Sequence, residues 1–82
     1  MKILVLGSGC ANCHKAEDIA KQAVVQLGVD AQVELVTDMK TVMRYGVMNP
    51  PGIVINDKIV STGRVPALSQ MTQMIVNAVA KQ

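Results

Sequence analysis

The sequence predicts an α/β fold in which the elements follow the order β-α-β-α-β-β-α and build a four-stranded mixed sheet with helices on both faces. Short β-branched runs that end at glycine, proline or asparagine are typical of buried strands. Apolar residues spaced three and four apart are typical of amphipathic helices, and the two patterns alternate along this chain. A strand, a crossover helix and a second strand give a parallel pair with a right-handed connection. A late hairpin then adds antiparallel strands.

The first strand and the first helix have the clearest patterns. Residues 3–6 are continuously apolar and end at Gly7-Ser8-Gly9, which favours a strand buried on both faces. From residue 11 the apolar positions follow helical spacing as far as Leu27. Gly28 comes just after the last of them, as a helix C-terminal glycine does.

The middle of the chain predicts a second strand over residues 33–36 and then a short helix over residues 39–43. Asp38 can cap this helix at its start, and Gly46 can end it. Residues 53–55 and 59–61 are β-branched runs on either side of Asn56-Asp57-Lys58, which is a hairpin signal.

The last segment is amphipathic and predicts a final helix. Pro66 is expected in its first turn, because no serine or threonine stands clearly at a cap position. The residues expected on its apolar face are Leu68, Met71, Ile75 and Val79.

The composition predicts one domain that covers residues 1–82. Half of the 82 residues are apolar, which is enough for a single core. Tyr45 is the only aromatic residue, so this core must be almost purely aliphatic. Four of the methionines occupy core-like helical positions and are expected to pack there: Met39, Met43, Met71 and Met74.

The charge pattern argues against nucleic acid as a partner, and the short first apolar stretch argues against a membrane span. The formal net charge is +2, and lysine and arginine are scattered along the chain without the basic cluster or stacking aromatics that nucleic acid binding uses. The apolar stretch before Gly7 is too short for a signal-peptide core or a membrane span. We therefore expect a cytoplasmic protein with a solvated and mildly basic surface. Separately, we expect a monomer.

Both cysteines and the only histidine lie within five positions, at Cys10, Cys13 and His14. In a reducing compartment, cysteines this close are catalytic or metal-binding rather than a structural staple. Cys10 lies between the predicted strand and helix, and Cys13 is one turn further on the same face, so the sulfurs can approach bonding distance. Unpaired N–H groups at the helix start favour a thiolate at Cys10. Because Cys13 should be less exposed, Cys10 is the predicted nucleophile and Cys13 the predicted resolving thiol.

The element order, the Cys-x-x-Cys at a strand-to-helix junction and a proline before a late hairpin resemble the thioredoxin superfamily, in its minimal thioredoxin/glutaredoxin-like form. The small thioredoxin-like proteins named redox-active disulfide proteins are the most similar branch. Four segments carry the likeness: Gly7-Ser8-Gly9-Cys10-Ala11-Asn12-Cys13, Tyr45-Gly46-Val47-Met48, Val54-Ile55-Asn56 and Gly63-Arg64-Val65-Pro66. The resemblance implies a protein-disulfide reductase, a thiol–disulfide oxidoreductase that exchanges a Cys10–Cys13 disulfide with a protein partner and receives electrons from a separate disulfide reductase.

The resemblance also implies a substrate-binding surface. The cis-proline that faces the dithiol in the family falls on Pro51, directly before the third predicted strand. The residue before it, which offers its backbone to an extended substrate, is Pro50, and proline has no N–H. We therefore expect weaker or more selective peptide docking. Gly9, Ala11 and Asn12 are the other expected substrate-binding residues.

Several features depart from the family pattern. The aromatic residue that commonly precedes the first cysteine is Gly9, no proline stiffens Ala11-Asn12, and the first strand lacks the buried acid that assists the resolving thiol. His14 is expected to point away from the sulfurs, and Met48 to lie near the substrate surface. No organic cofactor and no metal are expected.

Soft-metal capture is the main alternative. Gly-x-x-Cys-x-x-Cys also resembles the loop of heavy-metal-associated domains, whose two thiolates bind Cu(I). Those domains run β-α-β-β-α-β and end in a strand, whereas this chain is predicted to end in a helix. Cys10-x-x-Cys13-His14 also matches the haem attachment string, but a haem pocket would need more room than this chain has. A binding module with a vestigial dithiol also stays open, although the glycines beside Cys10 argue for access.

Overall fold

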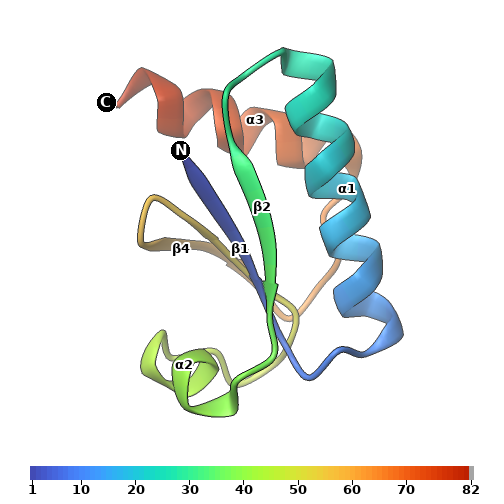
Figure 1. Cartoon of the computed structure of the whole chain (residues 1–82), viewed down its shortest axis with the longest axis vertical. Helices are drawn as coiled ribbons and strands as arrows, with labels where there is room; N and C mark the ends of the chain where they lie inside the picture. The colour runs from blue at the N-terminus through green and yellow to red at the C-terminus, as the bar shows by residue number, and fades with distance from the viewer. Residues whose placement is uncertain (82) are drawn as a thin grey trace.

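The computed structural model describes residues 1–81, and its elements follow the predicted order (Figure 1). They are β1 (Lys2–Leu6), α1 (Ala11–Leu27), β2 (Gln32–Val36), α2 (Met39–Arg44), β3 (Gly52–Ile55), β4 (Lys58–Thr62) and α3 (Leu68–Ala80). Each strand begins one residue before its predicted start, and the predicted order β-α-β-α-β-β-α is confirmed.

The strands form one mixed sheet of four, in the order β2-β1-β3-β4. β1 runs parallel to β2, with Leu6 opposite Val36, and antiparallel to β3, with Leu6 opposite Gly52. The carboxyl ends of β1 and β2 therefore meet the beginning of β3 at one edge of the sheet. This edge holds the segments that follow β1 and precede β3, which are the two segments expected to form the site.

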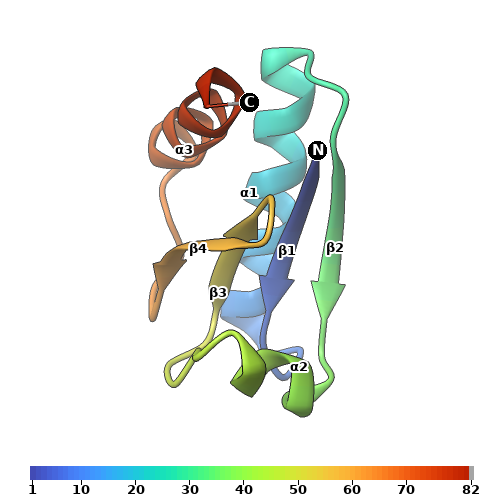
Figure 2. The same ribbon diagram turned by 90° about the vertical axis from the view of Figure 1, so that its left-hand side faces the viewer.

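Helices cover both faces of the sheet, as predicted. α1 and α3 lie side by side on one face, whereas α2 lies on the other (Figures 1 and 2). The larger core cluster, between the sheet and the helix pair, is built around Ile3, Val5, Ile53, Met71 and Ile75. A smaller cluster under α2 contains Leu6, Val42, Val47 and Val54. No polar or charged side chain among the described residues is buried.

Helix α1 is defined at both ends by residues that the sequence singles out. Cys10 is its N-cap, and Gly28 ends it with φ at 67°, a left-handed conformation that suits glycine. The Gly28 N–H donates to the carbonyl oxygens of Val24 and Val25 at 3.0 and 3.2 Å. The buried stripe of α1 consists of small side chains, which let the helix backbone approach the sheet closely: Cys13, Ala16, Ala20 and Ala23.

The hairpin between β3 and β4 confirms the turn signal. Asn56 and Asp57 both adopt positive φ, at 52° and 67°. Two consecutive residues of this kind are what a two-residue type I′ turn needs. Every residue of β3 is buried, whereas β4 is an edge strand and is mostly exposed.

The start of α3 differs from the prediction. The helix begins at Leu68 with Ala67 as its N-cap, so the placement of Pro66 in the first turn is wrong. The backbone of Ala67 is extended, and its N–H donates to Oε1 of Gln70 at 3.0 Å, so the N-cap is one residue after the buried proline and the first helical residue is two after it. Val79 is 42% exposed because it lies on the last turn, beyond the buried Met71 and Ile75.

Two of the four methionines predicted to pack in the core are exposed. Met39 and Met43 are 47% and 71% exposed, because the short helix α2 buries only Val42. Met71 is buried and Met74 is half-buried, in agreement with the prediction. None of the helices within residues 1–81 is long and apolar enough to cross a membrane.

Candidate active site

The site lies where β1 passes into α1. Cys10 has extended backbone angles, with φ at −68° and ψ at 169°, and acts as the N-cap of the helix. Its Sγ accepts a hydrogen bond from the backbone N–H of Cys13 at 3.2 Å. The sulfur thus takes the role that a side-chain oxygen has in an ordinary N-cap. It accepts a hydrogen bond from one of the backbone N–H groups that have no partner within the helix.

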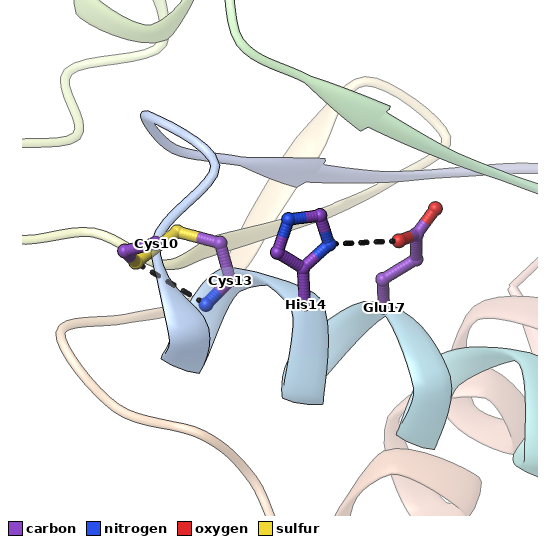
Figure 3. The surroundings of a disulfide bond; sticks show 4 residues. All are labelled: Cys10, Cys13, His14 and Glu17. Carbon is purple, nitrogen blue, oxygen red and sulfur yellow. Dashed lines mark hydrogen bonds and ion pairs between the residues drawn. A yellow bond between two sulfur atoms is a disulfide. The ribbon is translucent and has the colours of Figure 1, made fainter.

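Cys10 and Cys13 are joined by a disulfide (Figure 3). Their Cα atoms lie 5.0 Å apart, within the range that disulfides span without backbone movement. The predicted arrangement of the two sulfurs on one side of the helix start is confirmed.

The two cysteines differ in exposure, as the sequence predicts. Cys10 is exposed, whereas Cys13 has no accessible surface and faces the sheet. A large partner can therefore reach only the sulfur of Cys10 directly.

Gly7 provides the space that the inner sulfur occupies. A Cβ on this buried glycine would overlap Sγ of Cys13 and would lie 3.3 Å from Cβ of Pro50. The Gly7 N–H donates to the Val36 carbonyl at 3.0 Å, so its backbone is held by β2. From the sequence, Gly7 is expected only to end the first strand; its place directly after that strand and three residues before Cys10 is the signal that points to this contact.

The proline loop lies beside the dithiol. The peptide bond between Pro50 and Pro51 is cis. Pro51 is fully buried and its carbonyl accepts the Gly63 N–H at 3.1 Å, whereas Pro50 is exposed. Because Pro50 lies close to Gly7, the structure brings this loop next to Cys13.

The remaining residues of the predicted site surround the outer sulfur. Gly9 adopts φ at 85°, a conformation that glycine tolerates, and faces Thr37 at the end of β2. Ala11 and Asn12 are exposed in the first turn of α1. All the predicted site residues thus gather at one end of the molecule.

His14 takes no part in this cluster. Its Nδ1 lies 3.7 Å from Oε1 of Glu17, and the ring points along the helix toward that carboxylate rather than toward the disulfide (Figure 3). Glu17 also pairs with Lys21 at 3.5 Å. The expectation that His14 points away from the sulfurs is confirmed.

The element order is what argues against the two-thiolate metal site. Within residues 1–81, no three His, Cys, Asp or Glu side chains come together as metal ligands. The last element within these residues is the helix α3, whereas heavy-metal-associated domains end in a strand.

Comparison with known proteins identifies the family. Residues 1–76 match a family model described as a thioredoxin domain. A thioredoxin of Methanothermobacter thermautotrophicus is 33% identical over 75 residues, which cover 92% of this chain and 97% of the relative. A thioredoxin of Methanocaldococcus jannaschii is 32% identical over 71 residues, which cover 87% of this chain and 81% of the relative. With its paired cysteines at the start of α1, the chain belongs to the thioredoxin family and is a thiol–disulfide oxidoreductase.

Proposed function

We propose that Cys10 is the attacking thiol and Cys13 the resolving thiol in the reduction of protein disulfides. The Cys10 thiolate forms a bond to one substrate sulfur, and the other substrate sulfur leaves with the electron pair as a thiolate. The Cys13 thiolate then bonds to Sγ of Cys10 and displaces the second substrate thiolate. Two electrons have passed to the substrate, and the protein is left with the disulfide seen in the structure.

The observation that carries this assignment is the contrast between an exposed and a fully buried sulfur at one helix start. The N–H of Cys13 points at Sγ of Cys10, and the helix dipole adds a favourable interaction with an anion on the order of 1 kcal/mol. Both effects stabilise the thiolate form of Cys10. Cys13, held behind it, is placed to attack the mixed disulfide but not to capture a large substrate.

We further propose that a separate disulfide reductase returns electrons to the Cys10–Cys13 pair, and that the protein acts as a cytoplasmic monomer and a single domain. Pro50, Pro51, Gly9, Ala11 and Asn12 form the surface that a substrate touches. Their common position around the outer sulfur supports this role. The assignment to the narrower redox-active disulfide branch remains a prediction.

A redox titration tests the proposal. The protein is equilibrated in thiol/disulfide buffers of graded potential, its free thiols are trapped by alkylation, and the masses are read. We expect one two-electron transition that links Cys10 to Cys13. A pair that stays reduced and binds Cu(I) tightly would instead favour metal capture.

Single-cysteine variants test the two roles. Cys13→Ser should accumulate a mixed disulfide with a protein substrate through Cys10, because no resolving thiolate is left. Cys10→Ser is the matched variant and should trap little. Trapping through Cys13 at a comparable rate would reverse the assignment.

The missing N–H of Pro50 makes a separate prediction. Pro50→Thr and Pro50→Ala both supply a backbone donor, and one net hydrogen bond should raise kcat/KM for an extended peptide disulfide roughly two- to tenfold. The rate with a small disulfide, which has no backbone to bind, should stay unchanged. Equal peptide rates in wild type and both variants would show that position 50 does not limit docking.

A further inference from the structure

The residue that leads into the N-cap of helix α2 lies beside Gly9, the neighbour of Cys10. Thr37, just before the helix, has its Cγ2 3.8 Å from the place that a Cβ on Gly9 would take. The segment of residues 37–48 contains helix α2. At its other end, Met48 stands two residues before Pro50, which lies close to Gly7. Both views show α2 at the same end of the molecule as the loop from β1 to α1 (Figures 1 and 2).

The segment exposes three methionines. Met39, Met43 and Met48 are 47%, 71% and 90% exposed. Single exposed apolar side chains are ordinary on protein surfaces, but here three large ones stand within ten positions, in the segment that leads from Thr37 beside Gly9 to the proline loop. Unbranched thioether side chains adapt to partners of different shape, which suits a surface that binds several proteins.

Cations alternate with these methionines. Lys40 and Arg44 are exposed and form no salt bridge within residues 1–81. The one acid at this end of α2, Asp38, is engaged as the N-cap: its carboxylate accepts the Lys40 N–H at 3.3 Å and the Thr41 hydroxyl at 2.9 Å. The first turns of α1 and α2 carry no acidic residue. Exposed Arg64, next to Gly63 and the proline loop, adds a third positive charge.

We propose that this methionine–basic surface selects protein substrates whose reactive disulfide is flanked by acidic and apolar side chains. The surface is formed by Met39, Lys40, Met43, Arg44 and Met48. The proposal rests on the proposed function and names its substrate class. The cations speed the approach of an acidic partner, and the methionines cover its apolar side chains once it has docked. A second copy of the chain is disfavoured as the occupant, because two basic faces repel each other.

Two matched peptides test the substrate class. Each contains leucines and one cysteine held in a mixed disulfide with thionitrobenzoate; glutamates flank the cysteine in one peptide and lysines in the other. The Cys10 thiolate bonds to the peptide sulfur and expels thionitrobenzoate, whose absorbance gives the rate. Cys13 then displaces the peptide thiolate. The reduced protein should react roughly tenfold faster with the acidic peptide at low salt, and added salt should shrink the ratio.

Two sets of variants separate the contribution of the charges to the peptide rates from that of the methionines. Lys40→Gln with Arg44→Gln should lower the acidic-to-basic rate ratio at least about threefold. Replacing Met39, Met43 and Met48 by glutamine should slow both peptides by a similar factor and leave their ratio unchanged. Neither set should change the rate with dithiodipyridine, a small uncharged disulfide, because Cys10 and its helix start are untouched.

Control variants remove the same kinds of side chain from outside the methionine–basic surface. Lys58→Gln with Lys81→Gln removes two exposed cations, and Val25→Gln removes an apolar side chain that is 81% exposed. Lys58 pairs with Ile55, which lies opposite Ile3 at the beginning of β1, away from the site. These variants should keep the wild-type rates with both peptides.

Each contrary result identifies what fails. Equal wild-type rates with both peptides, or a ratio that survives loss of Lys40 and Arg44, would overturn the proposed substrate class. A wild-type dimer that the methionine variants dissolve in size-exclusion chromatography would assign the surface to a second copy and also overturn it. No reaction of the reduced protein with dithiodipyridine would instead overturn the proposed function itself.

Discussion

At the scale of single residues, the sulfur of Cys13 occupies the volume that a side chain at position 7 would need. The disulfide tethers Sγ of Cys13 above Gly7, where a Cβ would overlap it. In the reduced protein no bond holds this sulfur, so we expect it to yield to a new neighbour more easily. Gly7→Ala should therefore destabilise the oxidised form more than the reduced form. Overpacking of about 1–3 kcal/mol corresponds to a reduction potential raised by roughly 20–60 mV, read by titration in redox buffers.

Gly52 offers the matched control for this variant. A Cβ on Gly52 would lie 2.6 Å from Cγ2 of Val47, so Gly52→Ala is similarly crowded but touches no sulfur. It should lower the free energy of unfolding in both redox states and leave the potential unchanged. If Gly7→Ala behaves in the same way, Gly7 serves packing alone.

At the scale of elements, Tyr45 connects the end of α2 to the turn between β3 and β4. Its hydroxyl donates to Oδ1 of Asp57 at 3.3 Å. Partial burial, and then the charge of Asp57 and this hydrogen bond, raise the pKa of Tyr45 above its usual value of 10.0. A raised pKa means that the folded protein holds this proton more tightly than the unfolded chain. The resulting stability is complete below the usual pKa and is lost as pH rises through the folded pKa.

Unfolding at about pH 8 and about pH 11 tests this coupling. Wild type should lose more stability than Tyr45→Phe between the two values, since only wild type loses the tyrosine proton. Tyr45 is the only aromatic residue, so absorbance follows its ionisation directly. Asp57→Asn should move the midpoint back toward the usual pKa; a wild-type midpoint that already lies there would contradict the coupling.

The elements that could be predicted are those with a complete local signal. The alternation of alanines with polar residues and the final Gly28 define α1, and two residues suited to positive φ define the hairpin. The exposure of Met39 and Met43 could not be read from helical spacing, because spacing shows which face is apolar but not whether anything covers it. In α2, one buried side chain suffices to attach the helix.

At the scale of the whole molecule, the site depends on strand order. The cysteines are only three positions apart in sequence and could be assigned from local spacing. Pro50 and Gly7 are far apart in sequence and meet only because β3 runs antiparallel to β1. The resemblance to thioredoxins predicts that the proline loop lies beside the dithiol. The contact between Gly7 and Cys13 could not be predicted from the sequence and is seen only in the structure. Long-range contacts of this kind leave no periodic trace in a sequence.

The short span of the disulfide has a consequence for the working cycle. The bridged residues are only three positions apart, and loop-closure entropy gives such a bridge about 2 kcal/mol of stabilisation, compared with about 4.5 kcal/mol for one that spans a chain of this length. Most of the conformational freedom of the unfolded chain is thus the same whether the bond is open or closed. We therefore expect the stability of the fold to change by only about 2 kcal/mol when the bond opens, so that the sheet stays assembled while electrons enter and leave.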